Sequence, residues 1–559
     1  MATFGRFFIY LSLYGSGIAL YSNLFIFSAN HSFLSQMAKV FVASVHCLIF
    51  VLPVLMAQSR NIVVRLLGWI ILLVYFGYVF FLTSYFAYFG MVPELYAFGT
   101  SNATDVTEVA AHYFAQIFGI NEIACIVLAI IFFICVPKYK LGREAWLVVA
   151  LPVLLLSASF YRYGEPFRSK DFGNVTVVRR FGIPTFSYLS MYEWMTSQSG
   201  YLADNTVYPG RVSELIHDTQ PGTTALATLP DTIKKVILIQ IESFDPEAVD
   251  AVLNGVPAMP FVADLQNKCL NFDNFFTTKS VGGSSDAEFS LATGLIPSAK
   301  RPSIRHADFE RVPTLYERLK AQGIDSYFAH NNHIGFYGRQ AAYGQMPNIT
   351  YRFQGPKENI SEADFASKTL ANALATSDRF FYYFFNFKSH GPYLGYSEET
   401  AAAFALDTRT DNLQNYLVTM NEVDQLISSM FQQQLDGFEA GETVFMVTAD
   451  HPSYLHTVPT LESLTRIPMM LCHNSLTGET VDKLTSTIDL HPTILDLFGL
   501  PASETEIAQN MLSDTDNAVL LPVGKILFRD PDGTVQERSC NQSCRTFFDY
   551  TDQHIKLGQ

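Results

Sequence analysis

The sequence is poor in charge, and most of the charge that it carries is acidic. Only 16% of its 559 residues are charged, whereas soluble globular proteins average about 25%. The formal net charge is −15, so the chain lacks the basic surface that nucleic-acid binding requires. We therefore expect no nucleic-acid partner, and we expect part of the chain to lie in a membrane.

Cysteine is also scarce. Seven cysteines in a chain of this length do not make the disulfide scaffold of a small secreted protein. Cys47, Cys125 and Cys135 fall in apolar stretches, and we interpret them as packing residues. Cys540 and Cys544 lie close together near the C-terminus and could pair in an oxidising compartment, an outcome that the sequence leaves open.

Long hydrophobic runs fill the first third of the chain. A helix needs about 20 apolar residues to cross a bilayer, and the runs at 7–27, 33–56 and 63–89 meet this length. The runs at 120–136 and 145–161 are shorter but carry almost no charge. The first run is a poor signal peptide, because it is long and further runs follow. We therefore predict five transmembrane helices.

Basic residues are unevenly distributed among the loops between these runs. The segments 28–32 and 90–119 contain no lysine or arginine. The basic residues beside the other run ends are Arg6, Arg60, Arg65, Lys138, Lys140 and Arg143. Because lysine and arginine concentrate in cytoplasmic loops, we expect the N-terminus inside the cell and everything after residue 162 outside the cytoplasm.

The pattern changes after the last run. Residues 163–230 mix charge, glycine and proline without strong periodicity, which indicates a partly helical connector. From residue 231, short apolar runs alternate with amphipathic stretches such as 314–322. This alternation is typical of a mostly parallel sheet with helices on both faces. We predict a transmembrane domain at 1–162, a connector at 163–230 and an α/β domain at 231–559.

Apolar runs of the predicted sheet end in polar residues that suit metal or phosphate chemistry. The runs are 236–241, 326–329, 380–387 and 444–447, and the polar residues after them are Glu242, His330, Asn331, His390, Asp450 and His451. Open α/β sheets bind ligands outside the carboxyl ends of their strands. One histidine after a strand is usually structural, but several such ends in one domain favour a shared site.

A segment rich in glycine and serine, SVGGSSDAEF, contains the predicted nucleophile. Gly282 and Gly283 permit a tight backbone approach, and Ser285 with Glu288 has the spacing of a capping box, so we expect a helix to begin here. Ser284 would then lie at a helix N-terminus, which favours an anion. The alternative is that one of these serines only caps the helix.

The predicted nucleophile needs activation, because a serine hydroxyl is weak until its pKa is lowered. No base adjoins Ser284 in the sequence, but a bound divalent metal could activate it. Glu242, Asp450 and His451 supply two carboxylates and a nitrogen, with Ser284 as the fourth ligand. This oxygen-rich set favours Mn²⁺, with Mg²⁺ or Zn²⁺ as alternatives.

These motifs together resemble the sulfatase-type domain of the lipoteichoic acid synthase family. That family and its relatives, the membrane phosphoglycerol transferases, belong to the alkaline phosphatase/sulfatase superfamily. The matching segments are Glu242-Ser-Phe, Gly-Ser-Ser-Asp-Ala-Glu-Phe, Ser389-His-Gly-Pro, Ala449-Asp-His and Ile488-Asp-Leu-His-Pro-Thr-Ile-Leu-Asp-Leu-Phe-Gly. The family also has five spans before an outward-facing domain, so the resemblance covers nearly the whole chain.

The resemblance implies a role for each matching residue. Glu242, Asp450 and His451 would hold one manganese ion, and Ser284 replaces the threonine nucleophile of the family, which also contacts the metal. The residues that match substrate-binding positions are His330, Tyr337, Arg339 and His390, of which His390 could also assist proton transfer. Tyr337 stands in place of a tryptophan, a departure that leaves the substrate open. We interpret His333, His456, Asp286 and Asp489 as structural.

The activity that the resemblance implies is phosphoryl transfer at a bacterial cytoplasmic membrane. Ser284 would attack phosphatidylglycerol and release diacylglycerol, and the phosphoglycerol group would then pass to a glycan or glycerophosphate acceptor. The alternatives are a phosphoethanolamine transferase, a phosphodiesterase that uses water, and a catalytically inactive sensor or scaffold. A sulfatase proper is disfavoured, because Ser284 is not followed by the x-Pro-x-Arg sequence that formylglycine formation requires.

Overall fold

The computed structural model describes most of the chain. The described residues are 2–26, 33–89, 120–168, 182–183, 185–188, 209–210, 212, 229–230, 232–280, 282–298, 302–309, 312–332, 334, 339–354, 360–391, 393–406, 411–453, 455, 460–501, 507–513, 518–522, 524–530, 532–539 and 542–553. The chain divides into two units, broadly residues 1–198 and residues 199–559.

The first unit is helical. Its long helices are α1 (Ala2–Ile26), α2 (Phe33–Ser44) with its continuations η1 (Val45–Phe50) and α3 (Val51–Ala57), α4 (Ile62–Phe89), α7 (Ile120–Cys135) and α8 (Glu144–Arg168). Helices therefore cover all five predicted runs. The stretches Val40–Ala57 and Ile62–Ser84 are long and apolar enough to cross a membrane by themselves. The count of five spans stays a prediction.

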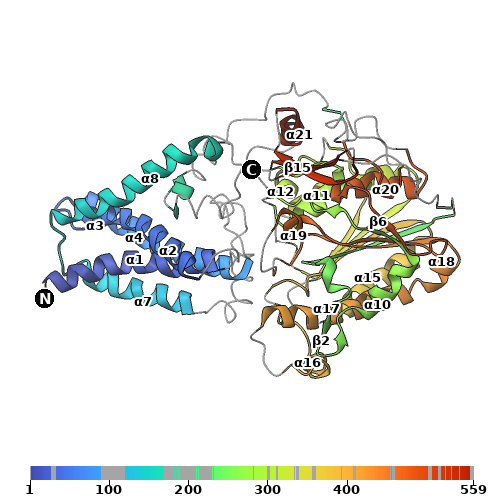
Figure 1. Cartoon of the computed structure of the whole chain (residues 1–559), viewed down its shortest axis with the longest axis horizontal. Helices are drawn as coiled ribbons and strands as arrows, with labels where there is room; N and C mark the ends of the chain where they lie inside the picture. Colours follow the sequence, from blue (N-terminus) through green and yellow to red (C-terminus); the bar gives the residue numbers. More distant parts are fainter. Residues whose placement is uncertain are drawn as a thin grey trace. The chain divides into compact units, whose positions relative to one another are not determined.

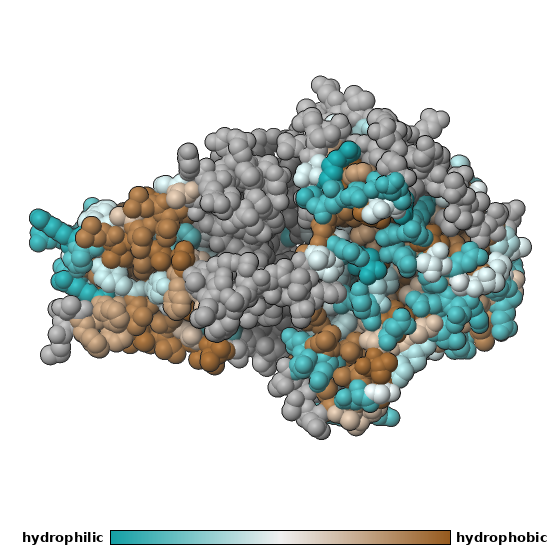
Figure 2. All heavy atoms as spheres, viewed as in Figure 1, coloured by the Kyte–Doolittle hydropathy of each residue, from teal (hydrophilic) through white to brown (hydrophobic). Residues whose placement is uncertain are grey.

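The outer surface of these helices is apolar. α1 packs against α2, α4 and α7, and Cys47, Cys125 and Cys135 are buried free thiols, which confirms that they are packing residues. Exposed large side chains on α4 and α7 include Leu66, Ile70, Leu73, Ile126 and Ile130. The visible face of this unit is largely hydrophobic in Figure 2. An apolar surface of this extent marks an interaction with lipid or protein.

The second unit is built on a sheet whose strand order is β11-β4-β10-β9-β1-β8-β6-β7. The strands are β1 (Lys235–Ile241), β4 (Cys269–Phe272), β6 (Asp325–His330), β7 (Thr350–Phe353), β8 (Phe380–Phe385), β9 (Thr443–Ala449), β10 (Met469–Cys472) and β11 (Glu479–Val481). Strands β9, β1, β8, β6 and β7 run parallel, and β10 is antiparallel to both of its neighbours. The predicted strands and the mostly parallel sheet are confirmed.

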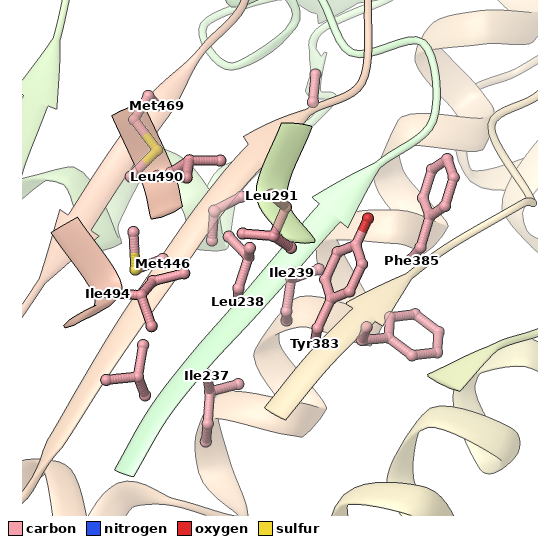
Figure 3. Packing of buried hydrophobic residues seen from close by; sticks show 14 of the residues in the cluster. Ile237, Leu238, Ile239, Leu291, Tyr383, Phe385, Met446, Met469, Leu490 and Ile494 are labelled. Atoms are coloured by element: carbon pink, nitrogen blue, oxygen red, sulfur yellow. The ribbon is translucent and has the colours of Figure 1, made fainter. Parts of the chain in front are cut away.

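Helices cover both faces of this sheet (Figure 1). One face carries α10 (Pro260–Leu265), α15 (Glu362–Thr376) and α17 (Asn412–Gln432), and the other carries α11 (Ser285–Thr293) and α20 (Leu490–Leu497). Leu238 of the central strand β1 faces Leu291 of α11 in the core (Figure 3). Strand β1 is buried on both faces, which explains the unbroken apolar run at residues 236–239.

Shorter elements complete the unit. The helices are α12 (Ser303–His306), α13 (Leu315–Lys320), α14 (Arg339–Gln345), α16 (Glu398–Ala403), α18 (Leu435–Glu439), α19 (Leu461–Thr465), α21 (Gln542–Gln553), η3 (Pro246–Ala248), η4 (Gln266–Lys268) and η6 (Thr487–Asp489). The strands are β2 (Val252–Leu253), β3 (Val256–Pro257), β5 (Phe275–Phe276), β12 (Thr485–Ser486), β13 (Val519–Leu521), β14 (Lys525–Arg529) and β15 (Val535–Ser539). Thr314 and Glu317 form a capping box at the start of α13, which confirms the helix predicted there.

A disulfide bond that the sequence did not predict joins Cys269 to Cys472. The two residues are directly paired across β4 and β10. Cys544 is also disulfide-bonded. Cys540, whose pairing with Cys544 the sequence left open, lies outside the described residues.

Candidate active site

The carboxyl ends of β1 and β9 bring together the predicted metal ligands. The two strands are parallel neighbours, so Glu242 after β1 and Asp450 and His451 after β9 emerge at the same edge of the sheet. All three side chains are buried, and each offers a ligand atom that lies within 4.8 Å of the other two. The predicted meeting of these strand ends therefore occurs in the structure.

Hydrogen bonds to the backbone fix the orientation of His451 and Asp450. The Nδ1 atom of His451 lies 2.8 Å from the carbonyl oxygen of Pro452, so with a proton on Nδ1 the Nε2 atom can act as a metal ligand. That Nε2 lies 3.2 Å from Glu242 Oε1 and from Asp450 Oδ2. Asp450 Oδ1 accepts the backbone N–H groups of Ser243 and His451, at 2.9 and 2.8 Å.

The chemistry of this cluster fits a divalent cation. Asp450 Oδ2 is buried and accepts no hydrogen bond among the described residues, a costly state for an oxygen unless an ion binds it. Burial and the charge of Glu242 raise the pKa of Asp450 to about 6. For Glu242, burial acts to raise the pKa, but His451 outweighs it and holds the pKa below its ordinary value. Two close carboxylates and an imidazole are therefore suitable ligands for a divalent metal ion.

Ser284 lies beside this cluster, as predicted. It is the N-cap residue of α11 and is 7% exposed, and its hydroxyl donates to Glu242 Oε2 at 3.0 Å. The predicted capping box between Ser285 and Glu288 is wrong. Ser284 rather than Ser285 is the N-cap residue, and the Ser285 hydroxyl donates to the carbonyl of Gly282 at 2.7 Å. The carboxylate of Glu288 bonds Arg339 and Tyr343 instead.

Asp286 fixes the loop that precedes Ser284. Its Oδ2 atom accepts the N–H groups of Ser280 and Gly282, at 2.8 and 2.9 Å. A Cβ atom at Gly282 would lie 2.1 Å from Asp286 Oδ1, and Gly283 has a φ of 60°. Each glycine therefore serves the tight approach that the sequence predicted, and Asp286 has a structural contact, as we expected.

The Ser389-His-Gly-Pro motif supports Glu242 from the neighbouring strand β8. The Ser389 hydroxyl donates to the Glu242 carbonyl at 2.6 Å, and the Glu242 N–H donates to Asn386 Oδ1 at 2.6 Å. Sequence reasoning did not select Asn386 or Ser389. The motif that contains Ser389 was the available signal, because a buried polar pair after a strand usually supports a site.

His330 and His390 both lie near Glu242, with which each interacts electrostatically. His330 is the last residue of β6 and its Nδ1 lies 2.8 Å from the Phe385 carbonyl. His390 is half-buried, with Nδ1 2.7 Å from the Gly391 carbonyl. Burial lowers the pKa of both rings, which favours neutral imidazoles. Their substrate contacts stay predictions.

Arg339 is buried in an ion pair that sequence reasoning missed. Its Nε donates to Glu288 Oε1 and Oε2, at 2.9 and 3.1 Å, and its Nη2 also bonds Glu288. Tyr343 donates to Glu288 Oε2 at 2.8 Å. Arg339 is 1% exposed, so the predicted phosphate contact competes with this pair. Tyr337, like His333 and His456, lies outside the described residues.

Lys279 is a second residue that sequence reasoning missed. Its ammonium group interacts electrostatically with Asp450, Glu242 and Asp286 and with His390. Burial lowers its pKa, and the three carboxylates act in the opposite direction. No motif signals this lysine, because its position depends on how the loop folds back over the strand ends.

Asp489 and His491 hold the end of the domain together, as expected for structural residues. Asp489 accepts the N–H groups of Ser486 and Gln509, both at 2.8 Å. His491 Nδ1 lies 3.1 Å from the Leu291 carbonyl.

Comparisons with known proteins found a matching family model and similar sequences. Residues 234–500 match the model of the Sulfatase family. The chain is 22% identical to the lipoteichoic acid synthase-like YvgJ of Bacillus subtilis (strain 168) in an alignment of 309 positions that covers 50% of each chain. It is 22% identical to lipoteichoic acid synthase 2 of the same organism in an alignment of 316 positions that covers 52% of this chain and 48% of the relative. The chain thus spans about half the length of these curated relatives.

Among solved structures, the chain is similar to the integral membrane protein lipooligosaccharide phosphoethanolamine transferase A (EptA) from Neisseria meningitidis. The TM-score is 0.54 at 14% identity, over 91% of this chain and 97% of that one. At this identity the likeness shows the fold.

Residues 234–500 of the second unit therefore form a Sulfatase-type domain. The chain is similar to lipoteichoic acid synthase-like proteins, and enzymes of the alkaline phosphatase/sulfatase superfamily use a divalent metal.

Proposed function

We propose that the chain is a membrane-anchored phosphotransferase that moves a phosphoglycerol group from phosphatidylglycerol to a glycan or glycerophosphate acceptor. The observation that carries this proposal is the 3.0 Å hydrogen bond from Ser284 Oγ to Glu242 Oε2, within the cluster of Glu242, Asp450 and His451. The Ser284 hydroxyl therefore lies at the N-terminus of α11, next to a buried carboxylate–imidazole set, which supports its proposed role as the nucleophile. The relatives named as lipoteichoic acid synthases support the choice of donor.

In the first step, Ser284 Oγ forms a bond to the phosphorus atom of the donor, and the bond to the diacylglycerol oxygen breaks. In the second step, an acceptor hydroxyl takes the phosphoglycerol group from Ser284. Each step exchanges one O–P bond for another, so the proton of the attacking hydroxyl ends on the leaving oxygen. His390 is proposed to carry this proton, since its neutral ring can accept one.

A divalent cation, Mn²⁺ foremost, would be held by Glu242, Asp450, His451 and Ser284, where it would lower the pKa of the hydroxyl and offset phosphoryl charge. Neighbouring residues of the chain fix the proposed ligands in place. Asn386 and Ser389 fix the backbone of Glu242, and the Pro452 carbonyl orients the imidazole of His451.

The apolar helices of the first unit support the proposed membrane attachment. We propose that they hold the second unit outside the cytoplasmic membrane, with the N-terminus inside, near a lipid donor. The unpredicted disulfide bond between Cys269 and Cys472 supports this orientation, because disulfides persist in oxidising compartments.

The test offers two lipids to the full-length protein in detergent with Mn²⁺. Diacylglycerol release from phosphatidylglycerol, absent in Ser284→Ala, is expected. Release from phosphatidylethanolamine alone would replace phosphoglycerol by phosphoethanolamine as the transferred group. This second candidate is favoured by the fold shared with EptA over most of both chains. Release from neither lipid, in protein that binds the metal, would contradict a glycerophospholipid donor.

A further inference from the structure

A groove outside the strand-end site lies between helix α15 and the edge of the sheet. Its volume is about 590 Å³, within the range of roughly 300 to 1,000 Å³ that small-molecule sites occupy. Strand β7 is the last strand of the sheet, so the groove opens where the sheet ends. Figure 1 shows α15 along this face of the sheet.

The walls of the groove combine aromatic rings with hydroxyl groups. One stripe of α15 contributes Phe365, Lys368, Thr369 and Asn372, at the spacing that puts residues on one helix face. The strands contribute Tyr327, Thr350, Arg352 and Tyr382. The Thr369 and Tyr382 hydroxyls bond each other at 2.7 Å, and the Tyr327 hydroxyl bonds that of Thr376 at 2.9 Å.

The charge of the groove is opposite to that of the chain. Among the described residues that line it, the fully charged side chains are Arg352 and Lys368, both exposed and both cationic, in a chain of net charge −15. The Arg352 guanidinium lies 5.8 Å from the centre of the Phe365 ring, which holds it against the wall. The cationic side chains of the groove can therefore pair with an anion. Its rings and hydroxyl groups can contact a polyol or a sugar.

The groove shares its strands with the active site. Strand β6 carries Tyr327 in the groove and ends at His330, and the N–H of Gln354, just after β7, donates to the His330 carbonyl at 3.2 Å. Three residues of strand cover about 10 Å. A chain of a few repeating units that is bound in the groove can therefore reach around the edge of the sheet to the strand ends.

We infer that this groove binds the acceptor of the transfer reaction, as a phosphate-bearing polyol or sugar chain. The role of the bound chain as acceptor rests on the proposed phosphoryl transfer. Binding of the chain to the groove can be measured without turnover. Arg352 and Lys368 pair with phosphates, and the ring and hydroxyl walls contact the units between them.

The experiment measures binding to full-length Ser284→Ala protein in detergent. The probes are a synthetic glycerophosphate tetramer, the neutral trisaccharide maltotriose, and inorganic phosphate. Arg352→Gln/Lys368→Gln should raise the Kd of the tetramer at least tenfold, and Thr350→Trp, which fills the groove from an exposed strand position, should do the same. The control Lys234→Gln/Lys525→Gln removes equal charge elsewhere and should leave the Kd unchanged.

Several outcomes would overturn the inference. One is that the groove variants bind the tetramer as tightly as the parent protein. Another is that the control variant loses as much tetramer affinity as the groove variants, and the third is that the parent protein does not bind the tetramer. Tight binding of maltotriose or of phosphate alone, with the tetramer no better, would also refute a phosphate-bearing chain as the ligand. Diacylglycerol release by variants that retain Ser284 reports separately on donor cleavage, so failure there with intact tetramer binding contradicts the proposed function and leaves the groove assignment standing.

Discussion

The guanidinium of Arg339 and the carboxylate of Glu288 form an ion pair in the interior of the α/β domain, with Tyr343 as a third member. Both charged side chains are almost fully buried. Resemblance assigns Arg339 to the substrate phosphate, whereas the structure gives it a partner 51 residues away in the sequence. The two roles make different predictions.

Arg339→Met should destabilise the domain by about 3–5 kcal/mol, because it leaves the Glu288 charge buried without its cation. Glu288→Gln/Arg339→Met removes both charges and should recover most of that stability, as measured by denaturant unfolding. If Arg339 also contacts substrate, the double variant stays deficient in diacylglycerol release. Full activity in a stable double variant would refute the substrate role.

Gly282→Ala should disturb the loop before Ser284, because the new Cβ would collide with Asp286. We expect a cost of about 1–3 kcal/mol and a loss of turnover on the order of 10²-fold, the effect of a displacement of about 1 Å at a reacting group. Gly344→Ala is the matched control, since nothing lies within 4 Å of its Cβ. Equal activity of both variants would show that the loop adapts freely.

Lys279→Gln should lower donor turnover by roughly 10²-fold, the effect of losing one preorganised charge or donor at a reaction centre. The same change removes a positive charge beside Glu242 and Asp450, so Mn²⁺ affinity should hold or increase. Turnover kinetics and metal titration together test this. Weaker metal binding in the variant would contradict the placement of the ammonium group beside the carboxylates.

Removal of the divalent metal by a chelator should abolish diacylglycerol release, and Mn²⁺ should restore it. At about 100 times its Kd, the ion should stabilise the domain by about 2.7 kcal/mol. Asp450→Asn should lose this thermal shift. A shift of the same size in the variant would mean that the ion binds elsewhere.

Glu362 should make the domain less stable at higher pH. Burial raises the pKa of this carboxyl to about 7, while an unfolded glutamate titrates near pH 4.3. The folded state therefore holds the proton more tightly. The contribution is complete below about pH 4 and is lost as the pH rises through about 7.

Glu362→Gln removes that titration, and its oxygen can still accept one of the N–H groups of Phe387 and Lys388 that bond Glu362. Between pH 5 and pH 8 its stability relative to the wild type should improve by roughly 1–3 kcal/mol. Thermal unfolding across this range checks it, with exposed Glu398→Gln as control. Parallel curves for the wild type and Glu362→Gln would contradict the prediction.

Sequence patterns predicted the features that depend on local order. Continuous apolar runs located β1, β6, β8 and β9, and the polar residues after them located Glu242, Asp450 and His451 at one edge. The sequence did not predict the ion pair between Glu288 and Arg339, because capping-box spacing is a local pattern whereas this pair joins distant segments. It did not predict the place of Lys279 near the carboxylates for the same reason.

The bond between Cys269 and Cys472 has a consequence for biogenesis. It joins β4, which is synthesised early in the Sulfatase-family domain, to β10, which is synthesised late, across a separation of 203 residues. This disulfide bond can form only after most of the domain has been synthesised and has reached a compartment where thiols are oxidised. Under the proposed orientation, maturation of the protein is coupled to export, and a chain that stays among cytosolic reductants lacks this cross-link between β4 and β10.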